Sequence, residues 1–251
     1  TCPAHMDVPD YIHSIRDGDY EKGLQLMYRT NPFPATCGRI CTRNCESVCP
    51  VGILGEPVAI RWLKRFIVDQ VDAKDYKRIL ADTITENGKK IAVIGAGPGG
   101  MSAAYYLRKK GYAVTVFESQ QSAGGMLRYG VPSYRLPDDD LDKDIDYIVS
   151  LGVEVKYNTA IGKDIKFEQL LENYDAVGQY RERQGNAPLV ERPELVRIEA
   201  RRRGIHVAEA GPVSSAKATG DDVGAFLGPG RVVPGRHDED RGLFLRLPGG
   251  C

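Results

Sequence analysis

The spacing of apolar residues changes once along the chain, near residue 89. Before that point, short amphipathic segments such as VPDYIHSIRDG and DYEKGLQLMYRT end in glycine or in turn residues, as helices joined by loops do. From residue 89 on, short continuous apolar runs bounded by glycine predict strands that are buried on both faces of a parallel sheet. The pattern therefore predicts an α/β protein whose N-terminal part is helical.

The segment EPVAIRWLKRFIVDQV has the clearest helical pattern in the N-terminal part. Its apolar residues fall on two adjacent rows, which predicts a helix that faces the core. The rows are Val58, Trp62, Phe66 and Ala59, Leu63, Ile67, Val71. Residues 73–88 are polar and irregular, and we expect them to form a linker.

A β-α-β unit begins at Lys89. KKIAVIGAGPGG predicts a strand and a glycine turn, MSAAYYLRKKG a helix, and YAVTVFE a second strand. Further along, DDDLDKDIDYIVSLG predicts a helix, VEVKY a strand, and KFEQLLENYDAV a helix that leads into a strand.

The turn after the first strand carries the G-x-G-x-x-G pattern, with glycines at 95, 97 and 100. Such a turn lets a pyrophosphate approach the backbone at the positive end of a helix. Glu118 follows Gly100 by 18 residues, at the end of the second strand, where a carboxylate can accept hydrogen bonds from a ribose. The segment predicts dinucleotide binding, and the acid favours FAD or NAD over NADP.

Four cysteines recur at intervals of four residues in CGRICTRNCESVCP. Disulfides are disfavoured because no secretory signal precedes a cofactor turn of this type, and the even spacing does not match zinc sites. Gly38 and Pro50 favour a loop over a helix here. Cys2 and Cys49 are each followed by proline, a feature that recurs in iron–sulfur sites.

Charge and hydropathy give no indication of a nucleic-acid-binding or membrane-spanning protein. Lysine plus arginine equals aspartate plus glutamate, at 34 each, so no bias toward nucleic acid or acidic membranes exists. No apolar run reaches the length of about 18 residues that spans a bilayer. We expect a soluble, cytoplasmic protein.

Residues 178–251 differ in composition from the rest. They hold one lysine against 11 arginines, with 12 glycines and 6 prolines, and no strand-like segment follows Val177. Reading GC-rich DNA out of frame would give this composition, so we interpret 178–251 as the result of a frame or assembly break. Because the chain starts at Thr1 without methionine, we also expect it to be a fragment.

The chain resembles the glutamate synthase small-subunit family, which includes the N-terminal part of dihydropyrimidine dehydrogenase. The likeness is carried by CPAHMDVPDYI, NPFPATCGRICTRNCESVC, IAVIGAGPGGMSAAYYL, VTVFES, AGGMLRYGVPSYRLPDDDLDKDI and NYDAV. It implies a helical iron–sulfur domain over 1–72, the linker over 73–88, and a truncated, Rossmann-like FAD-binding half domain over 89–177. Residues 178–251 stay unassigned.

The resemblance also implies the site residues. FAD would be bound by residues of the glycine turn, the acid after it and the GGMLR segment. These are Gly95, Ala96, Gly97, Pro98, Gly99, Gly100, Glu118, Gly125, Leu127 and Arg128.

Two [4Fe–4S] clusters are implied by the same likeness. Cys2, Cys41 and Cys45 would bind one, with its fourth ligand open between Cys37 and a residue other than cysteine. Cys49 would bind the other, whose remaining cysteines come from a segment upstream of Cys2. We therefore expect at most one complete cluster on this chain.

In function, the resemblance implies an oxidoreductase subunit that passes electrons from NAD(P)H through FAD to the clusters and to a partner subunit. No second glycine turn for the nicotinamide cofactor is visible. The chain alone is thus expected to bind FAD weakly or not at all and not to oxidise NADPH. The alternative is a non-catalytic docking or scaffold fragment that keeps the cluster domain and half a flavin fold.

Overall fold

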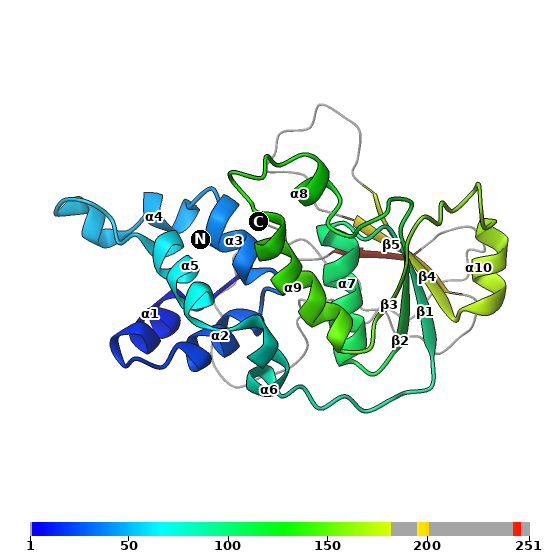
Figure 1. Cartoon of the computed structure of the whole chain (residues 1–251), viewed down its shortest axis with the longest axis horizontal. Coiled ribbons are helices and arrows are strands. Elements are labelled where there is room, and N and C mark those ends of the chain that lie inside the picture. The colour runs from blue at the N-terminus through cyan, green and yellow to red at the C-terminus, as the bar shows by residue number, and fades with distance from the viewer. Residues whose placement is uncertain (1, 182–194, 201–242, 247–251) are drawn as a thin grey trace.

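The computed structural model describes residues 2–181, 195–200 and 243–246. Its N-terminal part is helical, as predicted, and Figure 1 shows this part beside an α/β part built on one sheet. The N-terminal elements are α1 (Val8–Arg16), α2 (Tyr20–Tyr28), α3 (Pro34–Ile40), α4 (Asn44–Ser47), η1 (Pro50–Ile53), α5 (Ile60–Gln70), η2 (Ala73–Asp75) and α6 (Tyr76–Leu80).

The α/β part follows the predicted order of strands and helices. Its elements are β1 (Lys90–Ile94), α7 (Pro98–Lys109), β2 (Ala113–Phe117), α8 (Met126–Tyr129), α9 (Asp138–Ser150), β3 (Glu154–Lys156), α10 (Phe167–Asn173), β4 (Ala176–Arg181), β5 (Leu195–Ala200) and β6 (Leu243–Arg246). None of the helices in these ranges combines the length and the apolar composition needed to cross a bilayer.

The sheet has the strand order β3-β2-β1-β4-β5-β6, and β3, β2, β1 and β4 run parallel. The chain proceeds outward from β1 to β3 and then returns to β4 on the other side of β1. The carboxyl end of β1 is therefore a topological switch point, where ligands of such sheets bind. Helices α7 and α9 lie between the N-terminal helices and the sheet, and α10 lies beyond it (Figure 1).

Strand β4 corrects the prediction that no strand follows Val177. It continues to Arg181, with Gln179 opposite Ile94 of β1, and then pairs antiparallel with β5. The apolar run ends at Val177, but backbone pairing with a buried neighbour extends the strand. Most of the region interpreted as a frame break, including Cys251, lies outside the described residues, so that interpretation stays a hypothesis.

Helix α5 is confirmed, but its buried face differs from the predicted one. Trp62 and Phe66 are 52% and 40% exposed, whereas Lys64 is only 5% exposed. Helix α3 packs closely on α5, since a Cβ on Gly38 would lie 3.0 Å from the Cα of Arg65. Gly38 is therefore inside a helix at a close crossing, and the prediction that it marks a loop is wrong.

The predicted linker is helical in its first half. Helix α6 buries Tyr76 and Ile79 in the same core as α2 and α7. The sequence analysis missed this helix because only two of its residues, three positions apart, are buried, and the surrounding segment is polar. The irregular connection to β1 therefore begins only at Ala81.

One hydrophobic core joins the helical part to the α/β part. Four tyrosines meet at the seam, and Tyr28 packs edge-on against Tyr147 with ring centroids 4.9 Å apart. Tyr105 donates its hydroxyl hydrogen to the carbonyl oxygen of Tyr28 at 3.1 Å. The two parts thus share one core at this seam and are not independently packed domains.

Asp144 of α9 is the polar centre of the seam. The side chain is fully buried, and its carboxylate accepts hydrogen bonds from four donors. The backbone N–H and the hydroxyl of Thr36 donate at 2.9 Å each, and the N–H of Ala35 and the hydroxyl of Tyr28 donate at 3.2 Å. Asp144 therefore satisfies the free N–H groups at the start of α3, which has no capping side chain of its own.

A second contact fixes the other end of α3. The guanidinium of Arg39 lies 2.6 Å from a carboxylate oxygen of Asp140 on α9 and 2.7 Å from one of Asp69 on α5. Arg39 and Asp140 are largely buried, whereas the side chain of Asp69 is 34% exposed, so the pair with Asp140 is the better shielded from water. Helix α3 is consequently held at both ends, with Cys41 as the residue that directly follows it.

Replacing Asp144 by alanine tests this cap. The change leaves buried donors of Ala35, Thr36 and Tyr28 without an acceptor, so we expect a loss on the order of 3 kcal/mol in the free energy of unfolding. Urea unfolding measures it. Asp139→Ala, at an exposed position in the first turn of α9, is the matched control. Equal losses in both variants would contradict the capping role.

The same carboxyl group predicts a pH dependence of stability. Burial raises the pKa of Asp144 from its ordinary value near 3.8 to about 7, against the opposing effect of its donors. Between these two values the folded state holds a proton that the unfolded state has lost. The contribution of Asp144 to the free energy of unfolding therefore falls as pH rises from about 4 to about 7. In Asp144→Asn that decline is expected to vanish. Unfolding curves of both proteins across this range give the comparison, and parallel pH profiles would refute it.

Candidate functional site: a glycine turn and a group of thiols

The glycine turn lies between β1 and α7, at the switch point of the sheet. Gly95 has a φ of +92°, which glycine adopts at little cost. A Cβ on Gly100 would lie 1.9 Å from the carbonyl oxygen of Gly95, so only glycine allows the helix to start so close to the strand. Gly95 therefore allows the tight turn, and Gly100 allows the close packing of helix on strand.

The diglycine of AGGMLRYG packs directly on this turn. The N–H of Gly124 donates to the carbonyl oxygen of Ala96 at 2.8 Å. A Cβ on Gly125 would lie 2.8 Å from the Cα of Gly97, so the two backbones meet where no side chain fits. Residues about 28 positions apart are thus brought together into one backbone cradle, and their predicted contact with FAD stays a prediction.

The cradle fits a pyrophosphate group. Helix α7 has no capping side chain, so the first N–H groups of a 12-residue helix are available to an anion. A Cβ on Gly97 would meet only the Cα of Gly125, at 3.9 Å, which leaves open space at the mouth of the turn. Pro98 occupies the first helical position, where its missing N–H has no cost.

Glu118 reaches the turn from the end of β2 and is 6% exposed. One carboxylate oxygen accepts the N–H of Ala96 at 2.6 Å, and the other accepts the N–H of Gln120 at 2.8 Å. The residue therefore ties the glycine turn to β2. A carboxylate can accept about four hydrogen bonds, so a ribose contact remains compatible with these bonds and stays a prediction.

Leu127 and Arg128 are both held by contacts within the chain. Leu127 is 9% exposed and belongs to the core. Arg128 donates to the carbonyl oxygen of Ala123 at 2.7 Å and forms ion pairs with Asp138 and Asp142 of α9. Both residues fix α8 against α9, and their predicted contact with FAD stays a prediction.

The second part of the site consists of the thiols of Cys2, Cys41 and Cys45. Burial raises the pKa of Cys45, and the neighbouring thiols of Cys41 and Cys2 raise it further. Arg43, with a left-handed φ of +65°, turns the chain between α3 and α4 so that Cys41 and Cys45 are close. The thiols of Cys41 and Cys2 thus act electrostatically on Cys45, and the binding of one cluster by these three cysteines stays a prediction.

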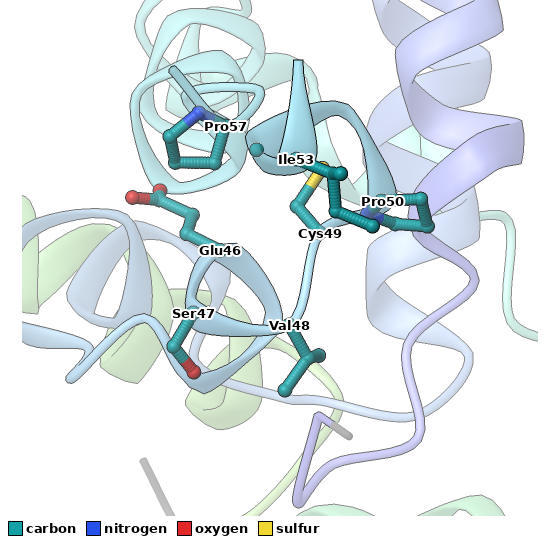
Figure 2. Close-up of a pocket in the computed structure, with 8 residues that line it drawn as sticks. Glu46, Ser47, Val48, Cys49, Pro50, Ile53 and Pro57 are labelled. Carbon is teal, nitrogen blue, oxygen red and sulfur yellow. The ribbon is translucent and has the colours of Figure 1, made fainter. Parts of the chain in front are cut away.

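Cys49 lies apart, at an open hollow of about 530 Å³ between η1 and α4 (Figure 2). The backbone N–H of Val58, with those of Val51 and Gly52, lowers the pKa of this thiol, and Glu46 is the charged neighbour that opposes them. A thiol with a lowered pKa is a better metal ligand.

Cys37 is fully buried inside α3, and the amide nitrogen of Asn31 lies 3.1 Å from its sulfur. Its role as a cluster ligand stays a prediction. Within the part of the chain that the structure describes, no three His, Cys, Asp or Glu side chains are grouped to hold a single metal ion. In a [4Fe–4S] cluster each thiolate binds its own iron, so the thiols need not converge on one point.

Two residues near the thiols were missed by the sequence analysis. Tyr11 of α1 is 1% exposed, and its hydroxyl has no hydrogen-bond partner among the described residues. Lys64 of α5 is buried beside Cys45. A lysine on the row of Ile60 and Ile67 was a usable signal, whereas nothing in VPDYIHSIR distinguishes Tyr11 from an ordinary core residue.

An unpartnered buried hydroxyl and a buried cation beside three thiols fit an iron–sulfur cluster. Burying either group alone is costly. The thiolates and sulfides of a cluster are negatively charged, so they would accept the hydroxyl hydrogen and balance the ammonium. The chemistry of this pocket therefore agrees with the implied cluster.

Comparison with known protein families matches both parts of the chain. Residues 1–76 match the family described as dihydropyrimidine dehydrogenase domain II, 4Fe-4S cluster. Residues 93–155 match the NAD(P)-binding Rossmann-like domain family. The expected order of domains agrees with these two matches.

Curated relatives extend the likeness. The NADP(+)-dependent formate dehydrogenase subunit beta of Moorella thermoacetica is 43% identical over 197 residues, covering 70% of this chain and 28% of the relative. The glutamate synthase [NADPH] small chain of Escherichia coli K12 is 30% identical over 190 residues, covering 73% of this chain and 40% of the relative. The chain thus spans well under half the length of these relatives.

Among solved structures, Mycobacterium tuberculosis FprA in complex with NADPH is similar to part of the chain. The TM-score is 0.34 at 23% identity, covering 42% of this chain and 26% of the other. Similarity at this level leaves function open.

Gly97→Ala separates cofactor binding from folding. The new methyl group meets only Gly125, so the free energy of unfolding is expected to change by less than about 1 kcal/mol. It fills the mouth of the cradle, so FAD affinity should fall by at least about tenfold. Titration with FAD, followed by flavin fluorescence, measures this effect.

Gly55→Ala is the control, because a Cβ at that position meets nothing within 4 Å. If Gly97→Ala bound FAD as tightly as the unmodified chain, the cradle would not be the pyrophosphate site.

Proposed function

Because residues 1–76 belong to the 4Fe-4S family of dihydropyrimidine dehydrogenase domain II and residues 93–155 to the Rossmann-like family, we propose that this chain is the cluster- and flavin-binding part of an oxidoreductase subunit. The subunit is of the glutamate synthase small-chain kind. It passes electrons from NAD(P)H through FAD to [4Fe–4S] clusters and then to a partner subunit.

The observation that carries the proposal is the packing of the thiol group and the glycine cradle on one rigid seam. Helix α3, which Cys41 directly follows, is fixed to α9 by Asp144 and Arg39. Arg128 in turn fixes the cradle segment to the first turn of α9. A single helix therefore sets the positions of both cofactor sites.

FAD supplies the conversion between two-electron hydride transfer and one-electron transfer. The chain's own residues provide binding and orientation. The backbone of Gly95–Gly100 and Gly125 would hold the pyrophosphate, and Glu118 holds the turn in shape. Cys2, Cys41 and Cys45 would bind one cluster, and Cys49 the other.

A protein partner is supported by the surface around Cys49. Ile53 and Leu54 are 86% and 91% exposed, and Val48 and Val51 are 58% and 49% exposed. Apolar side chains gathered on a surface are typical of a protein contact. We propose that electrons leave toward a partner at this end, in the cytoplasm.

Reconstitution of the full chain with iron, sulfide and FAD under anaerobic conditions tests the proposal. We expect one cluster, about four irons per chain, bound at the three-thiol group. Cys41→Ser should remove most of this iron, since it deletes a ligand. Cys49→Ser, on the separate hollow, should leave it nearly unchanged. Iron analysis and visible absorbance give the readout.

A chain that stays colourless with folded α/β structure would instead support the docking or scaffold alternative. Equal loss of iron in both variants would reject the separate assignment of Cys49.

A further inference from the structure

The hydroxyl of Tyr11 is a buried donor without an acceptor. Tyr11 lies in the middle of α1, and its side chain belongs to the main core. Among the described residues no hydrogen-bond partner is present for its oxygen. Since buried polar groups in folded proteins are nearly always satisfied, such a hydroxyl can donate to an acceptor that binds beside it.

Three thiols lie in the neighbourhood of this hydroxyl. Cys2 and Cys45 pack against the same core cluster as Tyr11. Burial raises the pKa of Tyr11 most, and the next contributions come from Cys45, Cys2 and Cys41, in that order. The thiols of the three cysteines, together with the carboxylate of Glu46, are therefore the titratable groups near this hydroxyl.

A cation accompanies the donor. Lys64, 5% exposed, lies near Cys45 and acts against the rise in the pKa of that thiol. Glu46, which accepts the N–H of Arg61 at 2.8 Å, ties α4 to the start of α5 and thereby holds Cys45 close to Lys64. One donor and one cation thus flank the thiols from α1 and α5.

We propose that Tyr11 donates its hydroxyl hydrogen to a sulfur atom of the iron–sulfur cluster bound by Cys2, Cys41 and Cys45, and that this bond raises the reduction potential of the cluster. The inference rests on the proposed function, since it requires a cluster at these thiols. Hydrogen bonds to cluster sulfurs favour the more negative, reduced state.

Tyr76 provides a matched control within the same core. It is 1% exposed, like Tyr11, and its hydroxyl also has no partner among the described residues. The charged groups near it are Asp144, Arg39 and Asp69, and no thiol is among its electrostatic neighbours. Removing either hydroxyl deletes one buried oxygen, but only Tyr11 faces the cysteines.

The experiment compares the full chain with Tyr11→Phe and Tyr76→Phe after anaerobic reconstitution with iron and sulfide. A redox titration with dithionite, followed by electron paramagnetic resonance of the reduced cluster, gives the midpoint potential. Tyr11→Phe should hold the same iron at a lower potential and lose one exchangeable-proton coupling in electron–nuclear double resonance. Tyr76→Phe should match the unmodified chain in both measurements.

Site-specific incorporation of 3-fluorotyrosine at position 11 should shift the midpoint potential in the direction opposite to that of Tyr11→Phe. Its hydroxyl is a stronger donor, so the potential should rise, which a purely structural role of Tyr11 would not produce. This measurement decides the question even if Tyr11→Phe assembles no cluster.

An unchanged potential with 3-fluorotyrosine, or equal potentials in Tyr11→Phe and Tyr76→Phe, would overturn the inference while the proposed cluster site stands. An unmodified chain that takes up no iron would overturn both.

Discussion

The capping of α3 by Asp144 is the interaction on which the arrangement of this protein depends. A carboxylate from the α/β part accepts the N–H groups of Ala35 and Thr36 in the helical part, at a position that solvent does not reach. Buried helix ends need such an acceptor. Because Cys41 directly follows α3, the position of this proposed cluster ligand depends on a contact made by a distant helix.

Close backbone approach is the second constraint. At three glycines a neighbouring backbone lies so close that no side chain would fit. The pairs are Gly100 with Gly95, Gly125 with Gly97, and Gly38 with Arg65. The first two create the cradle at the end of β1, and the third brings α3 onto α5. Glycine here acts less through flexible turns than through allowing two backbones to touch.

The thiol group shows how the electrostatics of the site depend on burial. Tyr11 and Lys64 are placed in the core at a free-energy cost, and their counterparts are the thiols at its edge. Cys49, by contrast, lies at an open hollow where backbone N–H groups lower the pKa of its thiol. The same residue type therefore meets two environments within a segment of 13 residues, Cys37–Cys49.

The sequence by itself determined the β-α-β unit, the glycine turn, Glu118 and the cysteine run, because these depend on local period, turn chemistry and spacing. It could not show that α5 buries Lys64 rather than Trp62, since a helix with apolar residues on several faces has no unique inner side. Nor could it show that β4 passes Val177, since pairing with β1 supplies what the apolar pattern lacks.

Only the tertiary structure decided which residues meet. The fold brings Asp144 to α3, Arg128 to α9 and Tyr11 near the thiols. The contact between Asp144 and Thr36 joins residues 108 positions apart. Burial and hydrogen-bond satisfaction are properties of the packed chain and leave no local trace in the order of residues. For that reason the sequence predicted the candidate site residues, but it did not predict the buried contacts that position them.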